Sequence, residues 1–208
     1  MGFTHIYIYD NNREGEERIA DVIDIENEYK DRVTIIPFHN EIYGQWKAYY
    51  DFYRQFNFDW VAIIDLDEFI TLTSQYRNIA EFLDSIPSRF GAVYVNWMCF
   101  GDCGLLNYDK GGLQERFKKP LPYRFSIFNM FGKSPQNNHV KMIVRSGFPD
   151  FCPLTPHNAD GKFDACNTKF ELIDKKSPFH DYTFEKCYIK HYITKSIGEY
   201  MIQKINRK

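Results

Sequence analysis

The sequence predicts an α/β fold in which a mostly parallel sheet carries helices on both faces, and three observations lead to this prediction. Within residues 1–100, short β-branched and aromatic runs alternate with stretches whose apolar positions recur at helical spacing. Those stretches are long enough for the crossovers that parallel strands require. A chain of 208 residues also suffices for one sizeable core, so we expect a single domain over residues 1–208.

The first expected unit is a strand, a helix and a second strand. Residues 3–9 alternate in character and stop at a polar Asp-Asn-Asn segment, residues 10–12, which is typical of a strand that ends in a loop. Residues 16–29 place isoleucine and valine on one helical face. The apolar run at residues 32–36 predicts the strand that closes this unit.

A second unit follows directly along the chain. Aromatic residues at helical spacing predict a helix over residues 45–56, and the apolar run at residues 60–64 predicts a strand that ends at Asp65. A further helix is expected at residues 79–86, followed by a short buried strand at residues 92–95.

The regular alternation fades in the second half of the chain. Residues 99–181 are dense in Gly, Pro, Asn and Asp, so we expect long loops and irregular strands that build an acceptor site. Regular structure returns with a strand at residues 188–192 and a helix at residues 196–204. Ser196 followed by Glu199 is a capping signature for that helix.

Charge and composition exclude several classes of protein. The formal net charge of −2, with a small basic end at Lys204, Arg207 and Lys208, argues against nucleic acid as a partner. The 18% aromatic content suits stacking on a sugar or base as well as core packing. The sequence shows neither a membrane-length apolar run nor a signal peptide, and its five cysteines lack a CxxC pair. We therefore expect a cytoplasmic protein with reduced thiols, at most peripheral at a membrane.

Asp65 and Asp67 form the strongest candidate for a functional site. They follow the apolar run at residues 60–64, at the carboxyl end of a strand, where open α/β sheets bind ligands. Desolvating two carboxylates is costly unless a cation compensates them, and Mg²⁺ or Mn²⁺ accepts such ligands together with phosphate oxygens. The alternative is an acidic turn that only caps the next helix. Neighbouring Glu68 and the polar residues 10–12, which we expect to face the same crevice, favour a functional site.

Five stretches of the chain combine into a more specific pattern. They are HIYIYDNN at residues 5–12, GQWKAY at 44–49, WVAIIDLDEFI at 60–70, IKHYITKS at 189–196, and NWMCFGDCGL with QERF and NNHVK within 96–141. Together they resemble the GT-A glycosyltransferases, in particular bacterial relatives of glycosyltransferase families 2 and 92. The resemblance implies a Rossmann-like GT-A sheet that lacks the usual first strand and helix, and hence an exposed sheet edge. It also implies a nucleotide-sugar-binding half at residues 1–98, with acceptor-side loops and a metal- and diphosphate-contacting segment at residues 99–208.

The resemblance further implies how the donor is held. Asp10 would contact the uracil or ribose of a uridine diphosphate sugar (UDP-sugar). Asn11 and Asn12 would shape that pocket, and Gln45 would belong to the same wall.

The same resemblance implies a metal site. Asp67 would ligate Mn²⁺ or Mg²⁺ directly, His191 would complete the site, and Asp65 would touch the ribose or the metal and its water shell. Lys195 would steady the diphosphate, since a cation can offset charge that develops on a leaving group. Taken alone, His191 has an alternative role as an ordinary core histidine of a strand.

The catalytic base has two candidates, because an inverting transferase needs one carboxylate beside the acceptor hydroxyl. Asp102 is preferred, since its flanking glycines permit a tight turn close to a ligand. Glu115 is the second candidate and could equally form an ion pair with Arg116. His139, Lys141 and His157 are candidates for contact with the acceptor or donor sugar, or ordinary loop residues.

The expected function is metal-dependent, inverting transfer of a hexose from a UDP-sugar to a saccharide acceptor, in glycan or cell-surface polysaccharide synthesis. The first alternative is a protein that binds a nucleotide sugar or carbohydrate without turnover. The second is phosphoryl or nucleotidyl transfer, which also uses clustered carboxylates. The second alternative would require more converging carboxylates than the sequence places together, and the sequence lacks a P-loop pattern.

Overall fold

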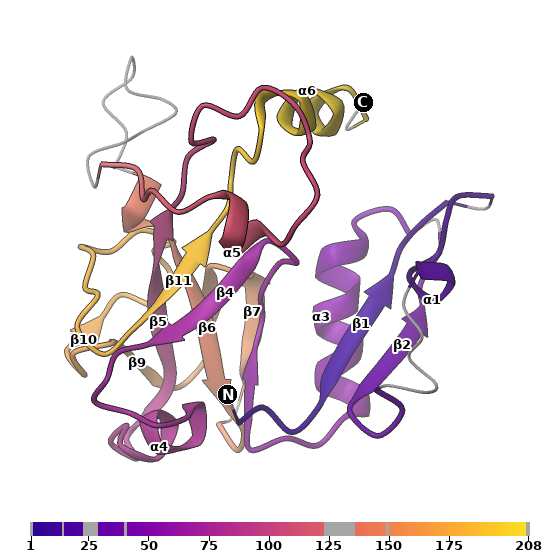
Figure 1. Ribbon diagram of the computed structural model, residues 1–208. Helices are drawn as coiled ribbons and strands as arrows, with labels where there is room; N and C mark the ends of the chain where they lie inside the picture. The colour runs from indigo at the N-terminus through magenta and orange to yellow at the C-terminus, as the bar shows by residue number, and fades with distance from the viewer. Residues whose placement is uncertain are drawn as a thin grey trace.

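In the part of the chain that the structure describes, the strands form a seven-stranded sheet and two small two-stranded sheets (Figure 1). The computed structural model describes residues 2–13, 15–22, 29–39, 41–122, 136–148 and 150–206. Within these ranges, none of the helices combines the length and apolarity needed to cross a membrane. All five cysteines are free thiols.

The N-terminal unit consists of β1 (Ile6–Asp10), α1 (Ile19–Val22) and β2 (Val33–Pro37). The two strands pair in parallel, as expected for a strand-helix-strand unit. The predicted helix at residues 16–29 extends beyond α1 into residues that lie outside the described part of the chain.

Helix α3 (Gly44–Gln55) covers this small sheet, close to the predicted residues 45–56. Its buried positions Gly44, Ala48 and Phe52 recur at intervals of four residues, which places them on one helical face. The ring of Phe52 packs against Tyr7 of β1, with 5.2 Å between the ring centroids.

The large sheet has the order β10-β9-β5-β11-β4, with β6 also paired to β5 and β3 paired to β6. Its strands are β3 (Trp60–Ala62), β4 (Glu68–Leu72), β5 (Phe90–Cys99), β6 (Val140–Arg145), β9 (Asp164–Asn167), β10 (Leu172–Ile173) and β11 (Cys187–His191). The longest strand, β5, is buried along almost its whole length, so the core lies on both of its faces.

The prediction of a mostly parallel, Rossmann-like GT-A sheet was wrong. Among the described strands of the large sheet, four of the six pairings are antiparallel and two are parallel. Only residues 63–67 separate β3 from β4, too few for a helical crossover between parallel strands. Strand β4 was also missed, and it pairs antiparallel with β11 instead of extending a parallel series.

The second half of the chain contributes more strands than expected. Residues 140–191 supply β6, β9, β10 and β11 to the large sheet, besides the hairpin of β7 (Cys152–Thr155) and β8 (Asn158–Asp160). Short helical pieces are α4 (Ile79–Asp84), α5 (Leu113–Arg116) and the 3₁₀ helix η2 (Gln136–Asn138). Strand β1 pairs with β2 alone and β3 with β6 alone, so within the described ranges each has one edge without a partner.

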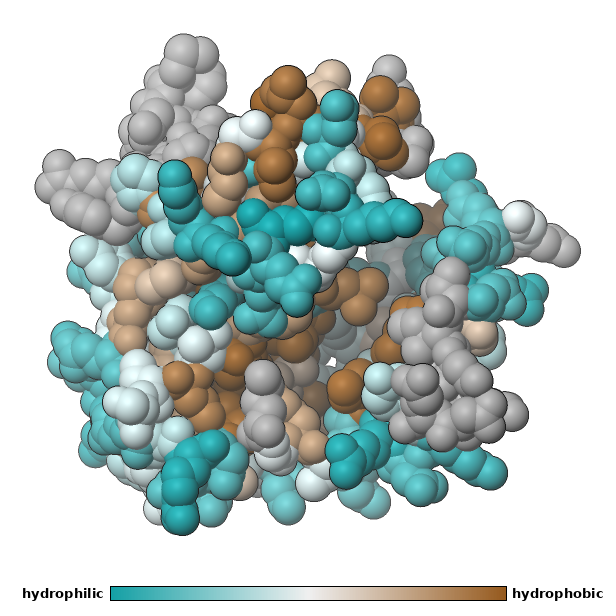
Figure 2. All heavy atoms as spheres, viewed as in Figure 1, coloured by the Kyte–Doolittle hydropathy of each residue, from teal (hydrophilic) through white to brown (hydrophobic). Residues whose placement is uncertain are grey.

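Several element ends meet on one side of the molecule. Figure 1 shows β1, β2 and β11 pointing towards the upper side of the view, where β4 begins and α6 (Ile197–Asn206) lies. Figure 2 shows the surface hollowed between the N-terminal unit and the large sheet. The residues that follow β1, β2 and β11 therefore lie on the same side of the molecule.

Candidate functional site

Three carboxylates lie where the chain turns from β3 into β4, and we call Asp65, Asp67 and Glu68 the acidic corner. The turn is closed by the backbone N–H of Glu68, which donates to the carbonyl of Asp65 at 3.1 Å. The Glu68 carboxylate in turn accepts from the backbone N–H of Asp65 at 3.0 Å. This local arrangement holds the three residues in one tight bend.

Lys141 of β6 neutralises one side of the acidic corner. Its Nζ lies 2.9 Å from Oδ2 of Asp65 and 3.4 Å from Oε2 of Glu68. The side chains of Lys141 and Glu68 are fully buried, whereas that of Asp65 is 47% exposed. Burial raises the pKa of Glu68 to about 7, against the opposing effect of the Lys141 charge. The other Glu68 oxygen, Oε1, is buried without a hydrogen-bond partner.

Asp67 lies between His191, the last residue of β11, and Lys195, which belongs to the segment that follows β11. Its Oδ2 is 3.2 Å from Nζ of Lys195, and its Oδ1 is 3.8 Å from Nε2 of His191. The backbone N–H of Tyr192 donates to the carbonyl of Asp67 at 3.1 Å, which ties the corner to the end of β11. Lys195 has a left-handed backbone with φ of 54°, an unusual conformation that places its side chain at the turn into α6.

His191 occupies the junction of three strands. It pairs with Glu68 of β4 on one side and Cys99 of β5 on the other. Burial lowers the pKa of His191 to about 4, so its imidazole is neutral near neutral pH despite the nearby Asp67 charge. Its Nδ1 is buried without a hydrogen-bond partner.

Asp67 and His191 bring one carboxylate oxygen and one imidazole nitrogen to within 3.8 Å of each other, and both are ligand types that divalent cations accept. Neighbouring ligands in an octahedral shell roughly 2.1 Å from Mg²⁺ lie about 3.0 Å apart, so the 3.8 Å spacing of these two atoms would have to shorten for both to bind one ion. A neutral imidazole is the form that binds a metal. Within the part of the chain that the structure describes, groups of three or more such ligands do not occur. The ion would therefore take its remaining ligands from water and phosphate oxygens, as Mg²⁺ commonly does.

The polar segment after β1 lies at the N-terminal end of α3. Asp10 is buried and accepts from the backbone N–H groups of Asn12, at 3.4 Å, and Ile19, at 3.3 Å. Asn11 accepts from the backbone N–H of Glu41 at 2.9 Å, just before α3 begins. This segment is therefore held by local hydrogen bonds, and within the described residues no ion pair or hydrogen bond joins it to the acidic corner.

Gln45 and Tyr49 connect α3 to the acidic corner. The Gln45 side chain forms a hydrogen bond with the Tyr49 hydroxyl. Burial, and to a smaller extent the charges of Asp65 and Glu68, raise the pKa of Tyr49. Asn11 also lies against the first turn of α3, since a Cβ placed on Gly44 would meet its amide at 2.4 Å. Contacts thus lead from the Asn11 segment over the start of α3 towards the acidic corner.

The two candidate bases are both engaged in local structure. Asp102 accepts from the backbone N–H of Gly104 at 2.9 Å, and Glu115 accepts from that of Gly112 at 3.2 Å. Asp102 follows the carboxyl end of β5. Because β5 pairs in parallel with β11, Asp102 lies at the same end of the sheet as His191. The described contacts do not join either carboxylate to the acidic corner, and the choice of base stays a prediction.

A cluster of rings lies under the acidic corner. Trp97 packs against His191, His139 and His157, with ring centroids 4.2, 4.8 and 5.3 Å apart. Burial lowers the pKa of His139 to about 4 and also lowers that of His157. Nε1 of Trp97 and Nδ1 of His139 are buried without hydrogen-bond partners.

Sequence reasoning missed the contacts of Lys141 and the roles of Trp97 and Tyr49. A lysine between valine and methionine in the run of residues 140–144 was an available signal, because a lysine in a buried strand requires a charged partner. The partner itself lies 76 positions away, at Asp65. Trp97 and Tyr49 carried no comparable signal, since each also fits an ordinary apolar run.

Replacing His139 with phenylalanine is expected to reduce the loss of stability in acid. The folded-state pKa of about 4 lies below the usual 6.5. Between these two pH values the unfolded chain therefore binds a proton at His139 and the folded chain does not. Stability is therefore lost as the pH falls from about 6.5 to 4, by up to roughly 3 kcal/mol for this one group. Phenylalanine retains the packing against Trp97 and Phe179 and removes the proton acceptor.

The measurement is urea unfolding of wild type and His139→Phe at a series of pH values between these limits. His5→Phe serves as the control. Its free energy of unfolding should change with pH as that of wild type does, because the buried His139 is still present. If the free energy of unfolding of His139→Phe falls with pH as steeply as that of wild type, this ring does not contribute to the loss of stability in acid.

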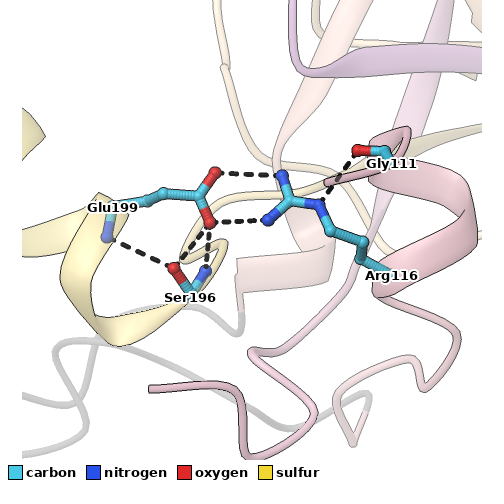
Figure 3. Close-up of polar contacts among 4 residues, drawn as sticks. All are labelled: Gly111, Arg116, Ser196 and Glu199. Atoms are coloured by element: carbon cyan, nitrogen blue, oxygen red, sulfur yellow. Dashed lines mark hydrogen bonds and ion pairs between the residues drawn. The ribbon is translucent and has the colours of Figure 1, made fainter. Parts of the chain in front are cut away.

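Arg116 holds the start of α6 in place. Figure 3 shows the paired nitrogens of Arg116 reaching both oxygens of Glu199, at 2.8 and 3.0 Å, and its Nε donating to the carbonyl of Gly111 at 3.1 Å. The backbone N–H of Glu199 donates to the Ser196 hydroxyl at 3.3 Å, and the Glu199 carboxylate accepts from the backbone N–H of Ser196 at 3.2 Å, which confirms the predicted cap between Ser196 and Glu199. The Arg116 hydrogen bonds lower the pKa of Glu199 to about 2. Because Lys195 directly precedes Ser196, this clamp also anchors the segment that contacts Asp67.

Arg116→Lys is expected to lower the free energy of unfolding by about 1–3 kcal/mol, because an ammonium cannot reproduce the two parallel hydrogen bonds of a guanidinium. Thermal and urea unfolding would measure this loss. Arg77→Lys is the matched control, since Arg77 pairs with Glu81 on an exposed surface. Equal effects of the two substitutions would contradict a stabilising role for the clamp.

The site therefore combines an acidic corner, two lysines and a neutral histidine at the point where β4, β5 and β11 meet. Two open surface pockets lie away from it, one beside Trp60 at the start of β3 and one along the outer side of α3. Neither contains the paired carboxylates. No family model, curated protein or solved structure matches the chain.

Proposed function

We propose that the chain transfers a hexose from a UDP-sugar to a saccharide acceptor, with inversion and with Mn²⁺ or Mg²⁺, in glycan or cell-surface polysaccharide synthesis. The observation that carries this proposal is the position of Asp67 between Lys195 and His191, two residues from Asp65 on the same turn. We expect the activity on the cytoplasmic side, in a protein that is free or peripheral at a membrane.

The proposed roles follow from charge and position. Asp67 and His191 would hold the cation, whose contribution when bound is to neutralise the diphosphate. Lys195, which is only partly exposed beside Asp67, would release that carboxylate and donate to a phosphate oxygen, stabilising the departing UDP. Asp65, half exposed and already neutralised by Lys141, would accept from a ribose hydroxyl or from a water molecule of the ion's shell.

Donor and acceptor would approach from opposite sides of the site. Asn11 and Gln45 lie on the side of α3 and would line the nucleoside pocket together with Asp10 and Asn12. Asp102 would accept the proton of the acceptor hydroxyl while that oxygen attacks the anomeric carbon and the bond to UDP breaks. Glu115 remains the second candidate for this role. A positioned attack of this kind inverts the anomeric centre in one displacement.

Binding without turnover is the second candidate function. It is favoured by one observation: the carboxylates of Asp102 and Glu115 are both occupied by backbone N–H groups. A base held in this way needs a rearranged loop before it can accept a proton from an acceptor.

Calorimetry and a nucleotide-release assay together test the proposal. UDP is titrated into the protein with Mn²⁺ and then with the ion chelated, and UDP release from UDP-glucose and UDP-galactose is followed over time. Ion-dependent UDP binding with release supports transfer or donor hydrolysis. Ion-dependent binding without release supports the second candidate, and the absence of UDP binding under both conditions contradicts both.

A further inference from the structure

Helix α6 exposes an apolar face that the rest of the described chain does not cover. Ile197, Met201, Ile202 and Ile205 are between 46% and 62% exposed. At about 100° per residue, Ile197, Met201 and Ile205 line up along the helix, and Ile202 widens the same face. An exposed group of large apolar side chains of this kind marks a surface that binds a protein, a membrane or a ligand.

The loop beside the helix extends this surface. Leu106 and Tyr108 are 65% and 66% exposed. The backbone N–H of Gly198 donates to the carbonyl of Leu106 at 2.8 Å, and that of Ile197 donates to the carbonyl of Leu105 at 3.1 Å, so loop and helix are tied together. In Figure 2, hydrophobic atoms gather at the upper edge of the molecule, where Figure 1 places α6. We call the four α6 residues with Leu106 and Tyr108 the apolar ridge.

Basic residues flank the apolar residues of α6 along the sequence. Residues 189–208 contain five basic residues, Lys190, Lys195, Lys204, Arg207 and Lys208. Their one acidic residue, Glu199, is engaged by Arg116 on another side of the helix. The whole chain carries a formal charge of −2, so this concentration of positive charge is local.

We propose that the apolar ridge docks on the surface of an anionic lipid bilayer. An amphipathic helix with exposed apolar residues and basic neighbours inserts its apolar face at the headgroup boundary and attracts anionic lipids. The clamp of Arg116 and Glu199 fixes the helix against the body, so the ridge is presented outwards without unfolding. This inference does not depend on the proposed transfer activity.

A second copy of the chain is a poorer occupant of the ridge. A second copy of the chain carries the same excess of basic residues over its residues 189–208, and like charges across an interface oppose association. A bilayer with anionic headgroups instead supplies both an apolar interior and the opposite charge.

Vesicle flotation of the full chain tests the proposal. Wild-type protein is mixed with vesicles of phosphatidylcholine alone and with vesicles in which about a third of the lipid is phosphatidylglycerol. We expect flotation with the anionic vesicles, reduced by high salt, and at least about tenfold weaker partitioning of Met201→Glu/Ile202→Glu. Leu172→Glu, at an exposed leucine of β10, is the matched control and should bind as wild type.

Circular dichroism and thermal unfolding must first show that each variant is folded. If the double variant fails to fold, Ile205→Gln replaces it with the same expected direction of change. Absent binding to anionic vesicles, or equal weakening by Leu172→Glu, would overturn the proposal. So would a stable dimer in light scattering that Met201→Glu/Ile202→Glu dissociates.

Discussion

Asp67→Asn is expected to lower UDP release from a UDP-sugar by about 100-fold or more. The amide lacks the charge that pairs with Lys195 and is a weaker ligand for a divalent cation, so the variant loses both interactions of this site. Removing one electrostatic contact to a transition state commonly reduces turnover by two to three orders of magnitude. The measurement is initial-rate UDP release at saturating Mn²⁺, with UDP binding followed by calorimetry.

Asp150→Asn is the matched control for this experiment. Asp150 pairs with Lys162 on an exposed surface at 3.1 Å, and the substitution removes a carboxylate far from any proposed role. We expect it to retain wild-type release. Undiminished release by a folded Asp67→Asn variant would contradict the proposed function.

Lys141→Met is expected to destabilise the protein by about 3–5 kcal/mol, because it leaves the buried Glu68 carboxylate without its cation. The half-exposed Asp65 can turn to water, but Glu68 cannot. Its folded pKa, already raised to about 7, would rise further. A raised carboxyl pKa removes stability as the pH increases from the unfolded value towards the folded one, so the deficit should be larger at about pH 8 than at about pH 5.

Two further variants separate the cause. Lys162→Met removes an exposed ion pair and should cost less than about 1 kcal/mol in urea unfolding. Lys141→Met/Glu68→Gln removes both charges and should recover part of the stability of Lys141→Met, because a neutral amide is cheaper to bury. A double variant as unstable as Lys141→Met would show that the unpaired Glu68 charge is not the cause.

Local elements were predictable where the pattern of residues was itself local. The aromatic spacing of residues 45–56 matches α3, and the capping pair Ser196 and Glu199 marks the start of α6. Helix periodicity and capping depend on neighbours three or four positions apart, so one sequence contains the whole signal.

Strand pairing was the main failure. The apolar run at residues 60–64 was recognised, but its neighbour β4 was not, because EFITL follows the acidic corner without the helical stretch that a parallel series requires. The partner of β4 is β11, more than 100 positions later in the chain. Parallel and antiparallel pairing use the same residue types, so composition did not distinguish them.

Within the site, the residue types were apparent in the sequence and their contacts were not. The pair of aspartates after an apolar run, the late histidine and the following lysine could be named from residues 65–67 and 189–196. Lys141 approaches Asp65 and Glu68 because β6 lies beside the acidic corner in the sheet. His191 and Lys195 approach Asp67 because β11 ends there. Such contacts join positions more than 70 residues apart, and only the pairing of the strands in three dimensions brings those charges within reach of one another.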